Sequence, residues 1–373
     1  MSETTDRAWY EPADPDAIAS PALLIFAERA EENVRHLIEV AGDVARLRPH
    51  VKTHKLPQIV QMHMAHGITK VKCATLAEAE MVAQAGVKDI LWAYQPVGPN
   101  QALLVNLAQR YPDVQFGCLV DNETVARQLE AKAAAGQIRL NVWIDTDNGN
   151  GRTGIVPGPG AEALAKQLSD AAALQFAGFH VYDGQFGHLA IDDRIEAANA
   201  AFAPVREMVS RLEAGGVNVP NIVAGGSPTF PVHALQPDLD LSPGTYSLWD
   251  IGYATRLPEL PFVHAAVLLV RVISKPAPNW LCLDLGHKAV AAENSLENRV
   301  RFLNATVDKY VTQMEEHLVI EVPNGAEFPI GAVLYGVPMH ICPTVALYQE
   351  AVAIDGDGQI IDRWPIVARN RRL

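Results

Sequence analysis

The sequence predicts an α/β protein made of a TIM-type (β/α)8 barrel and a second, mainly antiparallel β-domain. Eight short apolar segments between residues 45 and 242 alternate with stretches of helical apolar spacing, as βαβ units of a parallel sheet do. After about Pro261 the helical spacing stops and β-type runs follow one another. We expect the barrel over residues 20–261, and the β-domain over 262–373 together with an N-terminal arm, 1–19. A doubly wound open sheet is the alternative, but no GxGxxG motif follows the first strand.

The elements are expected in a regular order. A short buried strand at 21–26 precedes a helix at 27–40. The eight barrel strands are expected at 45–51, 69–74, 89–93, 115–120, 140–145, 176–181, 221–224 and 240–242. Helices are expected at 57–66, 76–85, 101–110, 122–135, 160–172 and 191–215. Later β-type runs lie at 262–274, 280–284, 318–322, 332–335, 346–354 and 360–367, and residues 355–358 form a hairpin signal.

The composition argues against several classes of protein. Acidic residues outnumber basic ones by 43 to 30, and the net charge of −13 argues against nucleic-acid binding. No apolar run reaches the roughly 20 residues that a membrane helix needs. The four cysteines form no CxxC pair and the N-terminal segment carries no apolar signal, so we expect a cytoplasmic protein.

Lys52 lies where the first barrel strand is expected to end. Barrel enzymes carry their chemistry at the C-terminal ends of the strands. The segment from Arg48 to Lys55 surrounds this amine with further basic side chains. Neighbouring cations favour the uncharged form of a lysine, which attacks carbonyl groups such as the aldehyde of pyridoxal phosphate. A basic surface loop is the alternative.

Two loops at late strand ends have the composition of a phosphate site. The loop after the seventh strand contributes Ser227 and Thr229, and the loop after the eighth contributes Gly244 and Thr245. Barrels often bind phosphate through these two loops, because glycine lets backbone N–H groups approach an anion and hydroxyls donate to it. Either loop alone is a turn; together with the lysine they predict a phosphate-bearing cofactor.

Three other side chains follow the fifth and sixth strands. Arg152 keeps its own proton, so it would keep a facing pyridine nitrogen unprotonated, although it also suits a structural turn. Tyr182 would lie near a planar cofactor, or pack ordinarily. His188 is a candidate general acid–base, with a solvated loop histidine as the alternative.

The second domain contains a candidate metal pair. If the preceding strand continues, His340 and Cys342 point to the same face, because side chains alternate with a period of two. Imidazole and thiolate together form half of a zinc-type site and leave positions for water and substrate. A buried cysteine beside an unrelated histidine is the alternative.

Taken together, these segments resemble the D-threonine aldolase and D-serine dehydratase family of fold-type III, alanine racemase-like pyridoxal phosphate enzymes. The resemblance runs from Pro21 to Trp364 and is most specific in residues 48–55, 151–154 and 182–188 and in the His340–Cys342 pair. It implies a PLP-binding barrel, a β-domain and a homodimer.

The resemblance also implies roles for single residues. Lys52 corresponds to the lysine that carries the coenzyme, Arg152 to the partner of its pyridine nitrogen, and Tyr182 to a tyrosine beside it. His188 corresponds to the catalytic histidine of the aldolases. Phosphate contacts fall on Ser227, Thr229, Gly244, Thr245 and Tyr246, and metal ligands on His340 and Cys342.

The reaction is predicted from two features that disagree. The His-x-Cys pair is the dehydratase form and favours zinc over manganese or magnesium, whereas the segment ending in His188 resembles the aldolases. We expect a lyase that cleaves D-threonine or a related D-3-hydroxy amino acid to glycine and an aldehyde. A D-serine dehydratase-type ammonia-lyase is the main alternative. A non-catalytic PLP-binding protein, a metal hydrolase without organic cofactor and a racemase are others.

Overall fold

The computed structural model describes residues 7–371 and divides them into two compact units. The barrel unit contains residues 35–52, 60–244 and 368–371, and the β-unit contains residues 7–34, 53–59 and 245–367. This division differs from the expected one at residues 20–34, 53–59 and 245–261, which lie in the β-unit, and at residues 368–371, which lie in the barrel unit. Residues 1–6 of the expected arm lie outside the described residues, and 7–19 contain the short 3-10 helix η1 (Pro15–Ala17).

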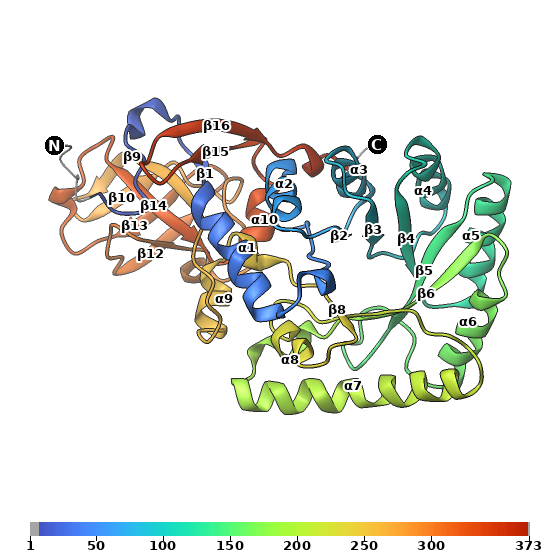
Figure 1. Cartoon of the computed structure of the whole chain (residues 1–373). Coiled ribbons are helices and arrows are strands. Elements are labelled where there is room, and N and C mark those ends of the chain that lie inside the picture. Colours follow the sequence, from blue (N-terminus) through green and yellow to red (C-terminus); the bar gives the residue numbers. More distant parts are fainter. Residues whose placement is uncertain (1–6, 372–373) are drawn as a thin grey trace. The chain divides into compact units, whose positions relative to one another are not determined.

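The barrel unit is built on seven parallel strands in sequence order (Figure 1). They are β2 (Lys70–Cys73), β3 (Asp89–Trp92), β4 (Gln115–Val120), β5 (Leu140–Thr146), β6 (Leu174–Val181), β7 (Ile222–Ala224) and β8 (Leu239–Leu241). Each pairs in parallel with the next, as βαβ units require. The prediction of a parallel α/β sheet is confirmed.

The first predicted strand, 45–51, is wrong as a strand but right in position. Its start is the 3-10 helix η2 (Val44–Arg46), and the rest makes only two isolated parallel bridges, Leu47 with Leu241 and His50 with Lys72. These bridges join the segment to β8 on one side and β2 on the other. Pro49 lacks an N–H and so interrupts the ladder. The curled sheet is therefore closed by an extended segment.

Helices follow the strands nearly where the sequence predicted them. They are α1 (Ala27–Ala41), α2 (Pro57–Ala65), α3 (Leu76–Gln84), α4 (Pro99–Arg110), α5 (Glu123–Ala135), α6 (Pro159–Ser169), α7 (Ile191–Ala214) and α8 (Phe230–Ala234). The side chains of Thr75 and Asn122 cap α3 and α5 by accepting backbone N–H groups. Apolar helix faces pack on the strands in one large core, which fixes the strand ends that carry the site.

The β-unit contains a nine-stranded, mainly antiparallel sheet. Its main path runs β12-β13-β10-β9-β1-β15-β16, and β14 joins β9 to β11. The bounds are β1 (Ala22–Phe26), β9 (Ala266–Ala277), β10 (Trp280–Leu283), β11 (Val300–Phe302), β12 (Lys309–Gln313), β13 (Leu318–Glu321), β14 (Val333–Pro338), β15 (Glu350–Ile354) and β16 (Ile360–Pro365). The predicted strand at 21–26 exists as β1, which pairs with β9 and β15.

The β-unit adds elements that the sequence pattern missed. Strands β11 and β12 and the short helices α9 (Ile251–Arg256) and α10 (Ile341–Val345) were not predicted. The hairpin at 355–358 is confirmed, since β15 and β16 pair on either side of it. Within the described range, no helix combines the length and the apolar character that crossing a bilayer requires.

Candidate active site

Lys52 follows the segment that closes the barrel. The backbone N–H of Val51 donates to Lys72 of β2 at 2.9 Å, and that of His50 donates to Pro243 at 2.8 Å. The chain then turns, and the Lys52 N–H lies 3.3 Å from Nδ1 of His50. The half-buried Lys52 is thus anchored at the C-terminal end of the neighbouring strands, as predicted.

Tyr182 and Arg152 come together at the ends of β6 and β5. The guanidinium carbon of Arg152 lies 4.6 Å from the centroid of the Tyr182 ring. On another part of this ring, a Cβ added to Gly226 would lie 2.8 Å from the ring carbon Cε2, so only glycine permits this approach. The aromatic ring therefore lies close to both the arginine and the glycine-rich loop after β7.

His188 ends the 3-10 helix η3 (Gly184–His188) and is exposed. Its Nδ1 lies 2.8 Å from the carbonyl oxygen of Gln185. Because a carbonyl only accepts, Nδ1 carries the proton, and Nε2 is the nitrogen that can accept one. The geometry suits a general base at Nε2.

The two predicted phosphate loops meet in the barrel unit. The backbone N–H of Gly244, after β8, donates to Oγ of Ser227, after β7, at 3.3 Å. Gly225 adopts a φ of +77°, which glycine tolerates without strain. Buried side-chain amide atoms of Asn148 and Gln185 have no hydrogen-bond partner among the described residues. Such polar atoms at strand ends suit a bound polar ligand.

Thr229 has a task inside the loop. Its hydroxyl donates to Asp183 and accepts the backbone N–H of Gly226 at 3.2 Å. The same carboxylate lies 2.6 Å from Nε2 of His233, and both of these side chains are fully buried. The hydroxyl predicted to contact phosphate thus orders the glycine loop.

Thr245 and Tyr246 belong to the β-unit. Both are buried, within the 3-10 helix η4 (Thr245–Ser247), and burial raises the pKa of Tyr246 well above its ordinary value. The Tyr246 ring packs against Phe262 with centroids 5.7 Å apart. Oγ1 of Thr245 lies 3.7 Å from Sγ of Cys342, so this loop approaches the predicted metal pair.

His340 and Cys342 come together for a reason other than the predicted one. The strand does not continue: β14 ends at Pro338, and His340 is the N-cap of α10. Burial lowers the pKa of His340, but hydrogen bonds to Cys342 and Glu293 outweigh this effect and raise it to about 9. Nδ1 lies 2.6 Å from Oε1 of Glu293. Metal-binding histidines are commonly oriented by such a carboxylate.

The surroundings of this pair are also polar. Oγ1 of Thr53 lies 3.1 Å from Sγ of Cys342. Oδ2 of Asp250 accepts the backbone N–H of Ile341 at 3.0 Å, which fixes the start of α10. Within the described part of the chain, no group of three or more His, Cys, Asp and Glu side chains is placed to hold a metal ion.

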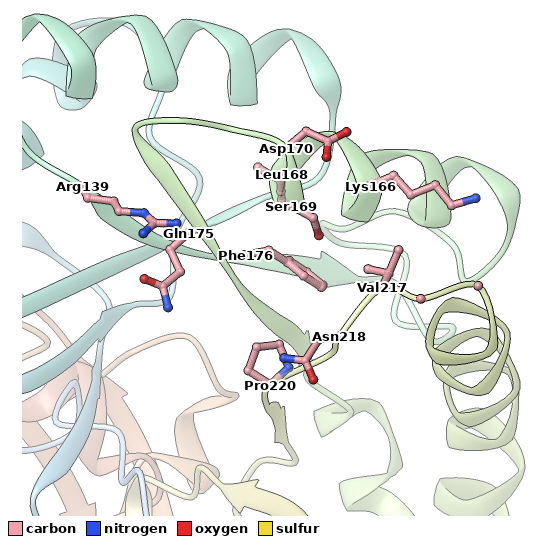
Figure 2. Close-up of a pocket in the computed structure, with 12 residues that line it drawn as sticks. Arg139, Lys166, Leu168, Ser169, Asp170, Gln175, Phe176, Val217, Asn218 and Pro220 are labelled. Carbon is pink, nitrogen blue, oxygen red and sulfur yellow. The ribbon is translucent and has the colours of Figure 1, made fainter.

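Two cavities differ in their relation to these residues. One, of about 590 Å³, borders His340; its lining includes Tyr253, Arg256, Glu293 and Arg301. Another, of about 550 Å³, lies at the N-terminal ends of β5 and β6 (Figure 2), the end opposite to the barrel's predicted site. We therefore assign no chemistry to the second cavity.

The sequence pattern missed a buried polar cluster inside the barrel. Lys72 of β2 donates to Oγ of Ser242 at 2.6 Å, and its Nζ lies 3.3 Å from Nε2 of His180. Nδ1 of His180 lies 2.7 Å from Oδ1 of Asp145. The available signal was a lysine within an otherwise apolar strand, since inward-facing charges in a barrel need partners.

Known proteins share both parts of this chain. The alanine racemase N-terminal domain family matches residues 25–247, and a putative serine dehydratase domain matches residues 265–354. The chain is 31% identical to the D-threonine aldolase of Arthrobacter sp, over 96% of this chain and 95% of that protein. It is 28% identical to the 3-hydroxy-D-aspartate aldolase of Paracoccus denitrificans (strain Pd 1222), over the full length of both.

Solved structures agree with this result. The D-threonine aldolase from Filomicrobium marinum superposes with a TM-score of 0.89 at 27% identity, covering 97% of this chain and 98% of that one. The D-threo-3-hydroxyaspartate dehydratase from Delftia sp. HT23 gives a TM-score of 0.82 and covers 96% and 99% of the two chains. Its identity of 23% supports the fold alone.

The fold and the site define an alanine racemase-like barrel protein with a second β-domain. The chain belongs to the D-threonine aldolase and D-serine dehydratase family. The family and fold class predicted from the sequence are confirmed, and the full-length relatives are lyases, as predicted.

Proposed function

We propose that this protein is a pyridoxal phosphate- and divalent metal-dependent aldolase that cleaves D-threonine or a related D-3-hydroxy amino acid to glycine and an aldehyde. The observation that carries the proposal is the end-to-end similarity to a D-threonine aldolase, 31% identical over 96% of this chain. A second aldolase of a D-3-hydroxy amino acid matches over its full length. The substrate is therefore a small D-amino acid with a hydroxyl on Cβ.

The residues at the barrel mouth fit the coenzyme. Lys52 would bind its aldehyde carbon covalently, and Arg152 would face its pyridine nitrogen. Support comes from the Tyr182 ring, whose centroid lies 4.6 Å from the guanidinium carbon of Arg152 and which packs closely on Gly226, where a Cβ would lie 2.8 Å from the ring. Ser227, with Gly244 bonded to it, would hold the phosphate.

Three of the residues predicted to contact the phosphate, Thr229, Thr245 and Tyr246, have other partners in the structure. The Thr229 hydroxyl is bonded to Asp183, so we assign Thr229 the task of ordering the glycine loop. Thr245 and Tyr246 remain predicted phosphate contacts. Their burial in one short 3-10 helix supports a fixed backbone at this end of the loop.

His340 and Cys342 fit a divalent metal. Nδ1 of His340 is bonded to Glu293, so the opposite nitrogen, Nε2, is available to a metal on the side of the Cys342 thiol. A nitrogen and a soft sulfur donor favour zinc over manganese or magnesium. A cysteine-to-alanine mutant of the D-threo-3-hydroxyaspartate dehydratase of similar fold has been solved in a metal-free form, which supports a metal site in that protein.

In the proposed reaction the chain's residues bind, orient and move one proton. When bound, the coenzyme supplies an electron sink and the metal a Lewis acid for the substrate hydroxyl. His188 takes the hydroxyl proton at Nε2 while the Cα–Cβ bond breaks. The electron pair of that bond stays with Cα, which then takes one proton in place of the proton that His188 removed, so glycine and the aldehyde leave with no net change in protons. Arg152 keeps the facing nitrogen free of a proton.

A dehydratase is the second candidate, because residues 265–354 match a putative serine dehydratase domain. In that reaction the Cα proton is removed, by Lys52, and the hydroxyl leaves from Cβ. The test is to incubate the zinc-loaded holoenzyme with D-threonine and to measure acetaldehyde against 2-oxobutyrate. We expect acetaldehyde and glycine in equal amounts. Predominant 2-oxobutyrate would make the protein a dehydratase.

Two further measurements test the coenzyme and the metal. Borohydride reduction of the holoenzyme followed by peptide mapping should label Lys52, and an unlabelled Lys52 would remove the basis of the proposal. Removing the metal by chelation should stop turnover while the coenzyme absorbance stays. A non-catalytic PLP-binding protein would show no turnover that depends on the metal. The homodimeric state and the cytoplasmic location stay predictions.

A further inference from the structure

A second lysine lies beside the proposed coenzyme site. Lys72 is 2% exposed, at the inner face of β2. Its Nζ donates to Oγ of Ser242 at 2.6 Å, and that hydroxyl donates in turn to the carbonyl oxygen of Gly225 at 2.8 Å. A buried amine held by a neutral hydroxyl costs free energy unless further groups share its charge.

Those further groups form a chain of hydrogen bonds. Nζ of Lys72 lies 3.3 Å from Nε2 of His180, and Nδ1 of His180 lies 2.7 Å from Oδ1 of Asp145. Thr153 donates to the second oxygen of Asp145 at 2.7 Å. Burial raises the pKa of Asp145, but its bonds to His180 and Thr153 outweigh burial and lower it. The ionised carboxylate fixes the proton on Nδ1, so Nε2 accepts from Lys72.

The amine also approaches the residues assigned to the coenzyme. Nζ of Lys72 lies 5.9 Å from the centroid of the Tyr182 ring, which Arg152 approaches to 4.6 Å. The carbonyl of Lys72 accepts the backbone N–H of Val51, the residue before Lys52. Two cationic side chains therefore approach one aromatic ring. An arginine keeps its proton at ordinary pH, whereas a buried lysine can lose one.

We propose that Lys72 is a positioning residue of the coenzyme site: held by Ser242 and His180, it supplies a removable positive charge beside Tyr182, in addition to the permanent charge of Arg152. This inference rests on the proposed function, because it assigns the charge to the coenzyme. With Lys72 protonated, the site stabilises the negative charge that develops when the Cα–Cβ bond breaks. With Lys72 neutral, only the arginine does so.

The surroundings make the charge of Lys72 sensitive to pH. Burial is the largest effect, and with the charges of Lys52 and Arg152 it lowers the pKa of Lys72 to about 7, against the opposing effect of Asp145 and Asp183. Burial and the charge of Lys72 likewise lower the pKa of His180. The charge of the site is therefore expected to change near pH 7.

The test follows the absorbance spectrum of the bound coenzyme against pH in four proteins. The wild type should show a transition near pH 7. Lys72→Met is permanently neutral and Lys72→Arg is permanently charged, so both variants should lose the transition. The spectrum of Lys72→Met should resemble that of the wild type at high pH, and the spectrum of Lys72→Arg that of the wild type at low pH. Lys70→Met is the matched control, because Lys70 lies two residues earlier on the same strand and pairs with Asp240. It should keep the transition.

Retention of the transition in Lys72→Met, or its equal loss in Lys70→Met, would overturn the inference. A second readout needs no coenzyme. Because the folded pKa of Lys72 is below its ordinary value of 10.5, the unfolded chain binds more protons between pH 7 and 10.5, and the stability of the apo protein rises with pH there. The unfolding constant of the wild type should fall by up to about tenfold per pH unit, and this slope should shrink in Lys72→Met.

The two proposals fail in different ways. If Lys52 is not labelled by borohydride, or D-threonine is not cleaved, the proposed function fails while the apo stability slope still tests Lys72. If cleavage occurs and the spectral transition belongs to another group, only the role of Lys72 fails. In turnover, Lys72→Met should lower kcat by at least tenfold and leave KM within about threefold, because the charge acts after substrate binds.

Discussion

The buried carboxylate of Asp183 supports the glycine-rich loop after β7, and removing it gives a sharp test of the site. It accepts hydrogen bonds from Oγ1 of Thr229 and, at 2.6 Å, from Nε2 of His233. Thr229 in turn accepts the N–H of Gly226, the glycine that lies against Tyr182. A change at Asp183 should therefore affect both folding stability and coenzyme binding.

The magnitude follows from the number of buried bonds that are lost. Asp183→Ala leaves two fully buried polar partners without an acceptor, and breaking a buried pair in this way costs roughly 3–5 kcal/mol of unfolding free energy. Thr229→Val removes one hydrogen bond to a charged acceptor and the partner of one N–H, which amounts to roughly 2–4 kcal/mol. Asp113→Ala is the control, because Asp113 is an exposed turn residue of the same unit.

Urea unfolding followed by tryptophan fluorescence measures the stability, and titration with pyridoxal phosphate measures coenzyme affinity. We expect the control to change by less than about 0.5 kcal/mol, as surface substitutions do. Thr229→Val should bind the coenzyme at least tenfold more weakly, because the Gly226 loop loses its internal bond. Equal stability of Asp183→Ala and the control, or unchanged coenzyme affinity in Thr229→Val, would refute this account of the loop.

Three other outcomes are expected. Glu293→Gln should lower zinc affinity by about 10–100-fold in a competition titration, because Glu293 orients His340; an unchanged affinity would remove this carboxylate from the metal site. A thiol reagent should modify the half-buried Cys342 before Cys118, whose pKa is raised by burial, and added zinc should protect Cys342; mass spectrometry of the peptides gives the order. Burial lowers the pKa of His63 from 6.5 to about 3, so the unfolded chain binds more protons in this range and stability falls with falling pH. His63→Gln should flatten that fall, by at most about 1.4 kcal/mol per pH unit in urea midpoints converted to free energy, and an unchanged slope would exclude His63.

Local patterns were sufficient for most of the barrel unit. The helix predicted at 191–215 is α7 (Ile191–Ala214), and the strand predicted at 115–120 is β4 (Gln115–Val120). The helix carries apolar residues at helical spacing and ends at glycine, which stops helices readily, and the strand is a short apolar run. Lys52 was placed from the same alternation, although the segment before it makes only two isolated bridges, and its chemical role stays a prediction.

Features set by distant pairing could not be read in this way. Strand β1 was predicted correctly as a strand, but its hydrogen bonds to β9 and β15 join residues more than 200 positions apart. The sequence contains no local signal for such partners. The candidate metal pair shows a different limit. A side-chain period of two predicted that both residues lie on one face of a strand, whereas His340 is the N-cap of a helix and Cys342 lies in its first turn. His340 and Cys342 lie close together because helix α10 begins between them.

The interior of the barrel shows why Lys72 was missed and how it differs from its neighbour. Lys70 and Lys72 point inward from β2, and Asp240 and Ser242 lie two residues apart at the facing edge around β8. Lys70 pairs with the Asp240 carboxylate at 2.7 Å, and Arg48 shares that carboxylate at 3.2 Å. One pair further along the strands, Lys72 meets the Ser242 hydroxyl instead of a carboxylate. Burial, with the charges of Lys52 and Arg152, lowers the pKa of Lys72 there.

The residue facing each lysine thus differs: Asp240 forms an ion pair with Lys70, whereas Ser242 gives Lys72 a neutral partner. Ser242→Asp would give Lys72 a carboxylate partner, as Lys70 already has in Asp240. An opposite charge at hydrogen-bond distance raises the pKa of a lysine. The coenzyme absorbance transition should then move at least one pH unit upward, while the same measurement on Ser242→Ala should move it downward, because the amine loses an acceptor. If neither substitution shifts the midpoint pH of the absorbance transition, the transition arises from a group other than Lys72.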